Sequence, residues 1–260
     1  MGRNPVEGAP SDFTSWRSIA MTLELDAYGF PRTSGIFETI KTVQGKPIAL
    51  GRHMRRALQS ATELGIPMPS EEAIRSEMLK VLAENPFDIG RLRICIYREG
   101  FLITHNEYQE NANPARLTFY SQTVLGAQHK LFPYDFRFSL LEIAKAEGFD
   151  DCLLFNAHNF ITESAVSNLL FRIDDEWITP PITSGILPGI IRALAIEECG
   201  VSVRPIHVSE VPAFESGFLI SSLRIAQPIS HIGEMKLEIG AASREMEAQI
   251  RTCAQPVSVG

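Results

Sequence analysis

The chain has 260 residues, enough for one large domain or for two of ordinary size. Hydrophobic residues make up 45% of it and charged residues 21%, the balance of an ordinary globular protein. Its net charge of −7 argues against nonspecific binding to nucleic acid or to an anionic membrane surface, and no apolar run reaches the roughly 20 residues that a membrane span needs.

Residues 15–122 predict an N-terminal α+β domain, and the polar, Gly- and Pro-rich residues 1–14 predict a mobile segment before it. Apolar residues at helical spacing predict a helix from Gly51 to Leu64. Ser70 suits the N-cap of a second helix that ends near residue 85. Alternating or apolar runs predict strands at residues 21–25, 34–43, 47–50, 91–98 and 116–120.

A composition break at residues 123–128 predicts a linker, and residues 129–260 are expected to form a C-terminal α/β domain. Helices are predicted at residues 140–147 and from Ser184 to Cys199. The stretch 160–171 predicts two strands with Glu163 between them. Further strands are predicted at residues 151–155, 177–179, 201–208, 217–222 and 226–231.

Cysteine and histidine placement bears on metals and on location. The four cysteines, Cys95, Cys152, Cys199 and Cys253, lie far apart and form no CxxC pair. The six histidines are equally scattered, so neither a zinc site nor metal catalysis is expected. The N-terminal residues lack the apolar core of a signal peptide. These features predict reduced thiols in a cytoplasmic protein.

Three short segments suit an anion, although each also has an ordinary structural explanation. Gly189 follows a proline at a helix start, where backbone N–H groups lack partners and the helix dipole is positive. Ser221 and Ser222 end a predicted strand, where hydroxyls commonly serve turns. Arg55 and Arg56 form either a solvated helix face or a phosphate clamp.

A single lysine is a candidate nucleophile. Lys130 lies among apolar and aromatic neighbours, so burial would lower its pKa and favour the reactive neutral amine. The alternative is a surface lysine whose stem covers apolar residues.

These segments follow one another in an order that resembles the class IV aminotransferases, the fold-type IV pyridoxal-phosphate enzymes. That family includes branched-chain and D-amino-acid aminotransferases, (R)-selective amine transaminases and aminodeoxychorismate lyase. The resemblance covers about residues 34 to 230 and is most specific from Thr162 to Arg192. The motifs, in order, are Gly-x-Phe-Glu-Thr from Gly35, His-x-x-Arg from His53, the lone Lys130, Asp-Asp-Cys-Leu-Leu from Asp150, Thr-Glu-Ser-x-x-Ser-Asn-Leu from Thr162, Thr-Pro-Pro-x-x-x-Gly-Ile-Leu-Pro-Gly-Ile-x-Arg from Thr179, and Ser-Ser-Leu-Arg-Ile from Ser221.

The resemblance implies a role for each matching residue. Lys130 would be the Schiff-base lysine and the proton shuttle between the substrate Cα and C4′ of pyridoxal 5′-phosphate. Glu163 would keep the pyridine nitrogen of the cofactor protonated. Tyr134 would hydrogen-bond the phenolic oxygen. The phosphate would be held by Arg56, by the N–H groups of Ile190 and Ile191, and by Ser222. The implied cofactor-binding set is completed by Ser167, Asn168, Gly189 and Ser221.

The sequence departs from the family pattern at two places. The usual Tyr-Gly-Asp-Gly element is replaced by Arg32-Thr33-Ser34-Gly35, and the asparagine common after the lysine is replaced near Pro133. Both changes affect the substrate pocket, whose stereochemical preference and carboxylate-binding residue are left open. Five side chains suit that carboxylate: Arg32, Arg93, Tyr97, Arg98 and Arg224.

The resemblance implies a two-domain fold of mixed α+β and α/β character, like that of D-amino-acid aminotransferase, and a homodimer. The expected activity is transfer of an amino group from an amino acid or amine to a 2-keto acid. Two alternatives remain at this point. One is an aminodeoxychorismate lyase that releases pyruvate and 4-aminobenzoate, and the other is a non-catalytic family member.

Overall fold

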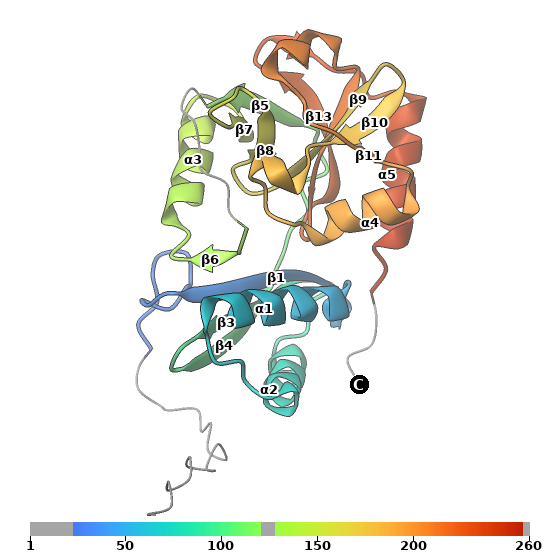
Figure 1. Ribbon diagram of the computed structural model, residues 1–260. Helices are drawn as coiled ribbons and strands as arrows, with labels where there is room; N and C mark the ends of the chain where they lie inside the picture. Colours follow the sequence, from blue (N-terminus) through green and yellow to red (C-terminus); the bar gives the residue numbers. More distant parts are fainter. Residues whose placement is uncertain (1–22, 121–127, 257–260) are drawn as a thin grey trace, which may run out of the picture.

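The computed structural model describes residues 23–120 and 128–256, which form two β-sheets with helices packed on them (Figure 1). The predicted mobile segment, residues 1–14, and residues 123–127 of the predicted linker lie outside the described residues. Within the described ranges, no helix is long and apolar enough to cross a membrane.

The smaller sheet lies in the lower half of Figure 1 and has the strand order β2-β1-β3-β4, with β6 also paired to β1. All of its pairs are antiparallel. Its strands are β1 (Gly35–Val43), β2 (Lys46–Pro47), β3 (Ile89–Tyr97), β4 (Gly100–Glu107) and β6 (Leu131–Phe132).

Side chains alternate along a strand, so the two faces of the smaller sheet have different surroundings: one packs against helices and the other faces a cavity. Ile36 and Ile40 of β1 pack with Ile94 of β3 against helices α1 (Leu50–Leu64) and α2 (Glu71–Glu84). The intervening residues of these two strands point away from the helices. Four of them line the cavity described below: Phe37, Thr39, Arg91 and Arg93.

The larger sheet has the order β11-β10-β9-β12-β13-β5-β7-β8, with β14 paired to β13. It is mixed, with parallel pairs between β10 and β11, β13 and β5, and β5 and β7. Its strands are β5 (Ala115–Phe119), β7 (Asp151–Phe155), β8 (Ile161–Ser164), β9 (Asn168–Ile173), β10 (Glu176–Thr179), β11 (Ser202–Val203), β12 (Ser216–Ser221), β13 (Ile225–Ile232) and β14 (Met235–Lys236).

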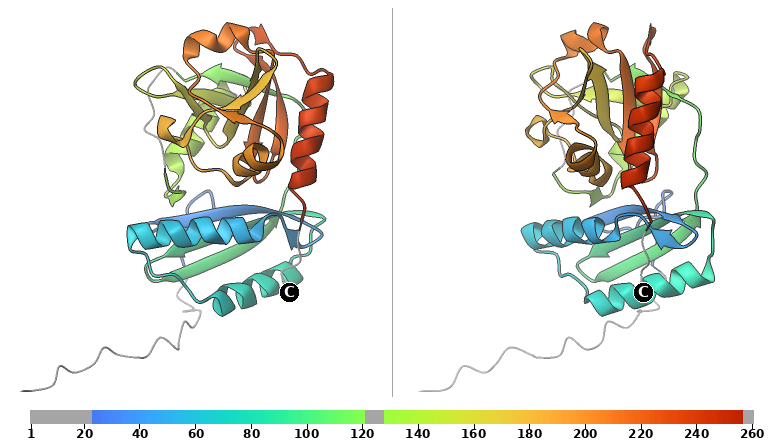
Figure 2. Two further views of the ribbon diagram at one scale, coloured as in Figure 1. Left: turned by 45° about the vertical axis from the view of Figure 1, so that its right-hand side comes forward. Right: turned by 90° about the vertical axis from the view of Figure 1, so that its right-hand side faces the viewer.

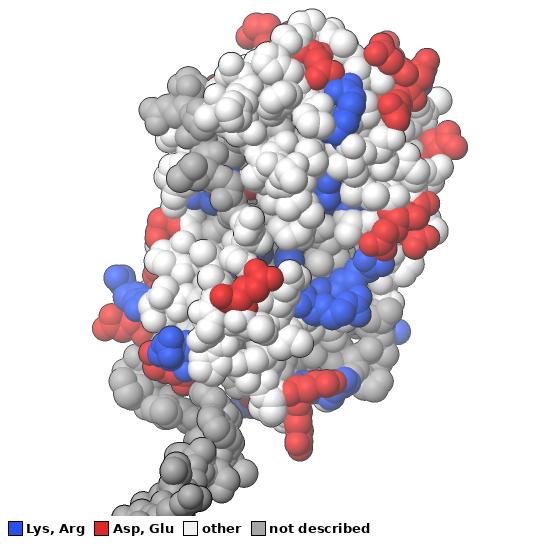
Figure 3. All heavy atoms as spheres, viewed as in Figure 1, with Lys and Arg blue, Asp and Glu red and all other residues white. Residues whose placement is uncertain are grey.

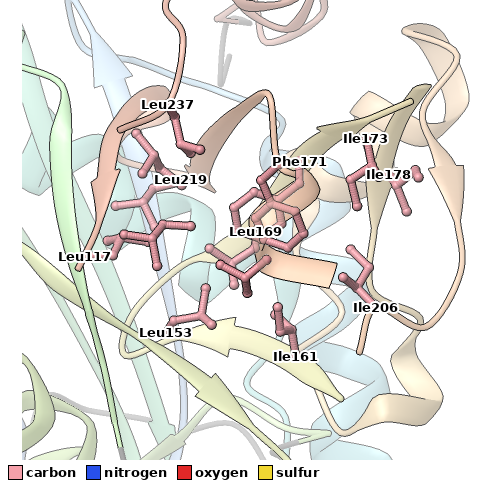
Figure 4. Packing of buried hydrophobic residues seen from close by; sticks show 14 of the residues in the cluster. Leu117, Leu153, Ile161, Leu169, Phe171, Ile173, Ile178, Ile206, Leu219 and Leu237 are labelled. Carbon is pink, nitrogen blue, oxygen red and sulfur yellow. The ribbon is translucent and has the colours of Figure 1, made fainter. Parts of the chain in front are cut away.

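Both faces of the larger sheet are buried. Leu169 and Phe171 of β9 join Leu219 of β12 in a core whose side chains point toward one another from several strands (Figure 4). Phe218 and Ile220 point the other way, against α4 (Ile190–Glu198) and α5 (Ala241–Cys253). Helix α3 (Asp135–Ala146) covers β7. Two 3₁₀ turns, η1 (Ile182–Ser184) and η2 (Val208–Ala213), complete the elements.

The chain crosses between the sheets more than once. Strand β5 precedes the predicted linker but pairs with β7 and β13 of the larger sheet. Strand β6 follows that linker but pairs with β1 of the smaller sheet. After α5, Pro256 forms a bridge with Ile48, so the chain returns to the smaller sheet (Figure 2). The division between the sheets therefore does not coincide with residues 123–128.

Several predicted elements are shorter than expected or differ in kind. Residues 23–25 form only an isolated bridge from Leu25 to Pro31, and both leucines there are exposed, so little burial supports a strand. The return strand of the first hairpin ends at Pro47, because Ala49 adopts a left-handed conformation (φ 52°) at the start of α1. The strand predicted at 201–208 is reduced to β11, since His207 caps η2.

Charged side chains are spread over the surface (Figure 3), and some of them lie at the junction of the two sheets. On the face shown in Figure 3, Lys and Arg side chains gather beside Asp and Glu side chains. At this junction Arg52 of α1 donates two hydrogen bonds, of 3.0 and 2.5 Å, to Glu197 of α4. This contact ties the helix layer of the smaller sheet to the helix beside the larger one.

Candidate active site

A cavity of about 260 Å³ is lined by residues from both sheets. All eleven side chains or backbone groups that the sequence singled out for a cofactor line it, so the structure brings the whole set together. They are Arg56, Lys130, Tyr134, Glu163, Ser167, Asn168, Gly189, Ile190, Ile191, Ser221 and Ser222.

Lys130 lies immediately before β6, with its Nζ in an aromatic corner of the cavity. Nζ is 4.6 Å from the ring centroid of Phe37 and 5.0 Å from that of Tyr134. Among the described residues it forms no ion pair. Burial and then the charge of Arg56 lower the pKa of Lys130 to about 8, against the opposing effect of the Glu38 and Glu163 carboxylates. At pH 7 about a tenth of this amine is therefore unprotonated and nucleophilic, far more than of an ordinary lysine.

The sequence predicted Glu163 in a crossing between two strands. In the structure it lies within strand β8 instead. Its carboxylate is buried and accepts three hydrogen bonds. Oε1 accepts from Arg137 at 2.7 Å, and Oε2 accepts from the Leu187 N–H at 3.0 Å and from Asn168 at 3.3 Å. Burial raises the pKa of Glu163, although Arg137 and the Leu187 N–H oppose this. Since a carboxylate has about four acceptor positions, one remains for a donor in the cavity.

Arg137 was not among the residues that the sequence predicted for the site. It is buried on α3 and also approaches the carbonyl oxygen of Ser164, at 3.4 Å. The signal was present, because Arg137 is three positions after Tyr134 and therefore shares its helix face. A lone arginine in an otherwise amphipathic helix does not, however, reveal which carboxylate it meets.

The opposite end of the cavity offers hydrogen-bond donors. Gly189 is the N-cap of α4 and no side chain caps this helix, which leaves the N–H groups of Ile190 and Ile191 available at the positive end of the dipole. Arg56 donates to Glu38 at 2.8 and 2.6 Å and to the Pro188 carbonyl at 2.8 Å, so three of its five N–H groups are used.

His53 and Glu38 stand behind this end and were absent from the predicted set. His53 Nδ1 is 2.6 Å from Glu38 Oε2, and Nε2 is 3.2 Å from Ser222 Oγ. Burial would raise the pKa of Glu38, but Arg56 and His53 outweigh it and hold the pKa at about 2. Both residues belong to the motifs that carry the family resemblance. The sequence did not predict their contact, because it depends on how α1 packs beside β1.

The remaining wall is rich in arginine. Of the five side chains considered for a substrate carboxylate, Arg93 and Arg224 line the cavity, whereas Arg32, Tyr97 and Arg98 do not. Arg91 also lines it and was missed. Arg224 is paired with the buried Asp151 at 2.9 Å.

Arg93 and Arg91 have no carboxylate partner within the described residues, and the Nε of each lacks a hydrogen bond. Arg93 is 6% exposed, and its guanidinium lies 4.1 Å above the Phe30 ring. Burial, helped by Arg91, lowers the pKa of Arg93 to about 10. Arg93 donates a hydrogen bond to the Tyr28 carbonyl oxygen at 2.6 Å, but no carboxylate of the described residues balances its buried charge, so an anion is the natural occupant of this wall.

Comparison with known proteins identifies the family. The model of amino-transferase class IV matches residues 35–232. The chain belongs to the class IV aminotransferase family. A probable branched-chain-amino-acid aminotransferase of Rickettsia felis is 25% identical over 228 residues, which span 77% of this chain and 78% of the relative.

Two solved structures show that the fold is that of the class IV enzymes. A putative 4-amino-4-deoxychorismate lyase from Legionella pneumophila has a TM-score of 0.77 at 23% identity, covering 84% of this chain and 91% of the other. A PLP-bound hypothetical aminotransferase from Mycobacterium tuberculosis has a TM-score of 0.75 at 17% identity, covering 85% and 88%. The expected fold-type IV architecture and family are thus confirmed.

Class IV aminotransferases use pyridoxal phosphate, and the cavity fits this cofactor. An amine with a lowered pKa faces a carboxylate that has a free acceptor position. An uncapped helix start supplies N–H donors for a phosphate. The buried hydroxyl of Ser167 lacks a partner in the described structure and lines the same cavity. No group of three or more His, Cys, Asp or Glu side chains in the described ranges could hold a metal ion.

Proposed function

We propose that this class IV enzyme transfers an amino group between an amino acid or amine and a 2-keto acid, with Lys130 as the catalytic residue. The carrying observation is that Lys130 and Glu163 line one cavity, with the amine held near a pKa of about 8. Pyridoxal phosphate supplies a conjugated ring that accepts the electron pair left when a Cα–H bond breaks.

The roles proposed for the residues combine the family resemblance with the place of each side chain in the cavity. Lys130 Nζ would hold the cofactor and would serve as the base and acid that moves a proton at the substrate Cα, which requires an amine that is neutral part of the time. The free acceptor position of Glu163 holds the proton on the pyridine nitrogen. Tyr134 donates to the phenolic oxygen of the cofactor.

We assign the phosphate to the end of the cavity where α4 begins. The proposed donors there are Arg56, Ser222 and the N–H groups of Ile190 and Ile191, with Ser221 beside them. Ser167 and Asn168 complete the set on the side of Glu163, where the Asn168 amide donates to Glu163 and to the Leu187 carbonyl.

We propose that the substrate carboxylate binds at the arginine wall, with Arg93 as the principal contact. Arg93 is the most buried of the three arginines in this wall and has no carboxylate partner in the described part of the chain. Arg91 adds a second positive charge on the same strand face. Arg224 is already engaged with Asp151, so it contributes less to a new ion pair.

Aminodeoxychorismate lyase activity is the alternative. It uses the same lysine and carboxylate, and the Legionella pneumophila structure of similar fold bears that name. The arginine wall suits an anionic substrate in either reaction.

A single-turnover experiment distinguishes these functions. Purified protein loaded with pyridoxal phosphate is mixed with D- or L-alanine, and conversion to pyridoxamine phosphate is followed by absorbance. Conversion supports transamination. Pyruvate release from aminodeoxychorismate without that conversion supports the lyase. A protein that remains colourless with pyridoxal phosphate, with no borohydride-reducible adduct, would overturn both in favour of a non-catalytic member.

We further propose a homodimer in the cytoplasm. Phe136 and Ile143 of α3 are two helical turns apart on one face, yet 55% and 47% exposed, and Leu131 of β6 is 43% exposed. A second copy of the chain would cover this apolar strip. Light scattering should give twice the chain mass, and Phe136→Asp should shift it toward the monomer. A monomeric wild type would contradict the proposal.

The proposed location in the cytoplasm is supported by the cysteines. Those of the described residues are all free thiols, which suits a reducing compartment.

A further inference from the structure

Glu38 of β1, His53 of α1 and Ser222 after β12 form a row of hydrogen bonds that ends in the cavity. Glu38 and His53 are 2% and 1% exposed, and of the three residues only Ser222 lines the cavity. The links are 2.6 Å from His53 Nδ1 to Glu38 and 3.2 Å from His53 Nε2 to Ser222.

The direction of the last link depends on the charge of His53. An ionised Glu38 can only accept, so it takes the Nδ1–H of His53. In neutral His53 the Nε2 atom is then an acceptor, so the Ser222 hydroxyl donates its hydrogen bond to it. The Ser222 oxygen would present only lone pairs to the cavity, which suits water but repels the oxygens of a phosphate. A second proton on Nε2 reverses the link and frees the Ser222 hydroxyl to donate into the cavity.

The charges around His53 favour the neutral form while no anion is bound. Burial lowers the pKa of His53, and Arg56 of the same helix and Lys130 across the cavity lower it further. Only Glu38 of β1 opposes them. A phosphate dianion at the start of α4 would add two negative charges on the side where His53 now meets Ser222, and this attraction acts through a poorly solvated region.

We propose that His53 takes up one proton from solvent when a phosphate group binds at this end of the cavity, and that Ser222 thereby changes from acceptor to donor. His53 acts through Ser222 and is a positioning residue. The inference rests on the proposed function for the identity of the ligand, since the phosphate is that of the cofactor. It adds a coupling between cofactor retention and protonation, so that cofactor affinity falls as pH rises through the range in which the bound state carries the extra proton.

Calorimetric titration of the cofactor-free, full-length protein with pyridoxamine 5′-phosphate tests this directly. This probe carries the phosphate but no aldehyde, so it does not react with Lys130. Titrations at about pH 7.5 in buffers of different ionisation enthalpy give the number of protons taken up on binding. We expect His53 to account for about one proton per ligand in the wild type, and His53→Gln to lose that uptake.

Two variants make the result specific. His158→Gln changes an exposed histidine outside the cavity and should keep the wild-type uptake. His53→Asn retains an N–H donor for Glu38 without a titratable ring and serves if His53→Gln does not fold.

The outcomes separate the two proposals. Binding with equal uptake in wild type and in a folded His53 variant would overturn the inference while leaving the cofactor assignment intact. So would uptake below about 0.2 proton in the wild type alone. Failure of the folded wild type to bind the probe would overturn the cofactor assignment and the inference together.

Discussion

Arg137 and Glu163 form a buried ion pair in the wall of the cavity, with Arg137 Nη2 2.7 Å from Glu163 Oε1. The pair links α3 to β8, and its carboxylate is the one proposed to face the cofactor ring. The carboxylate could not be kept ionised in such surroundings without a cation beside it. Arg137 therefore belongs to the electrostatics of the site although it does not line the cavity.

Arg137→Met is expected to destabilise the fold by about 3–5 kcal/mol, because it leaves Glu163 buried without its cation. For a chain of this size that corresponds to a fall in melting temperature of about 6–20 °C. The pKa of Glu163 is already raised by burial, so its ionisation in the folded state costs stability as pH rises. Without Arg137 this cost increases, and the loss should be larger at about pH 8 than at about pH 5.

The control is the partner substitution. Glu163→Gln should leave the cofactor bound while slowing proton abstraction severely, and it strands Arg137 without a carboxylate. The double variant Arg137→Met/Glu163→Gln should then be destabilised by less than the sum of the two single changes. Additive effects in thermal unfolding would show that the two side chains do not act as a pair.

Gly189→Ala tests the close approach of α4 to the site. A Cβ at Gly189 would lie 1.8 Å from Asn168 Oδ1, and Asn168 is buried between Glu163 and the Leu187 carbonyl. Since such overpacking costs about 1–3 kcal/mol, we expect the dissociation constant for pyridoxal phosphate to rise by roughly 5- to 150-fold. Equilibrium dialysis of the cofactor measures this.

Gly240→Ala is the matched control. Gly240 is the N-cap of α5, as Gly189 is of α4, and a Cβ there meets no atom within 4 Å. Its φ of −93° suits any residue. The control should bind the cofactor like the wild type. Equal affinity in the Gly189 variant would mean that Asn168 can move at no cost to the cofactor site.

The sequence predicted the local elements of the site better than their lateral contacts. Helical spacing located α1 to within one residue, and Ser70 does cap α2, accepting from Ala73 N–H at 3.2 Å. Lys130 and Glu163 were found because they fall within an ordered series of motifs. The contact of Arg137 with Glu163 and the place of Arg91 in the cavity wall were not predictable, because each depends on distant segments of the chain.

Strand ends and chain crossings were also beyond sequence patterns. An apolar run at residues 201–208 reads as one strand, yet η2 begins after His207 because Glu210 and His207 cap it. The pairing of β5 with the larger sheet depends on β13, more than a hundred residues away. Periodicity describes which face of a strand is buried and is silent about which strand lies beside it.

Arg93→Met tests the proposed substrate contact. Arg93 forms no ion pair in the described structure, so its replacement removes one hydrogen bond, to the Tyr28 carbonyl at 2.6 Å, and the protein should remain folded. Loss of a charge-assisted hydrogen bond of about 1.5–3 kcal/mol should raise KM for a carboxylate-bearing donor by roughly 10- to 150-fold. Steady-state kinetics with an amine lacking a carboxylate should change far less.

Arg98→Met provides the comparison, because Arg98 is an exposed arginine that does not line the cavity. It should leave KM unchanged. A similar rise in KM for both variants would point to a general effect of charge. An unchanged KM in Arg93→Met would assign the substrate carboxylate to Arg91 or Arg224 instead.

Lys130 should capture the cofactor with a pH dependence set by its surroundings. Burial, followed by the charge of Arg56, lowers the pKa of Lys130 from 10.5 to about 8. Only the neutral amine attacks an aldehyde, so the capture rate of the cofactor-free protein should rise with pH and level off above about 8. Stopped-flow absorbance follows the rate, and borohydride reduction with peptide mapping locates the adduct.

The control is Lys145→Ala, which replaces an exposed lysine of α3 and should behave like the wild type. A midpoint near 10.5, or a reducible adduct that persists in Lys130→Ala, would place the reactive amine elsewhere.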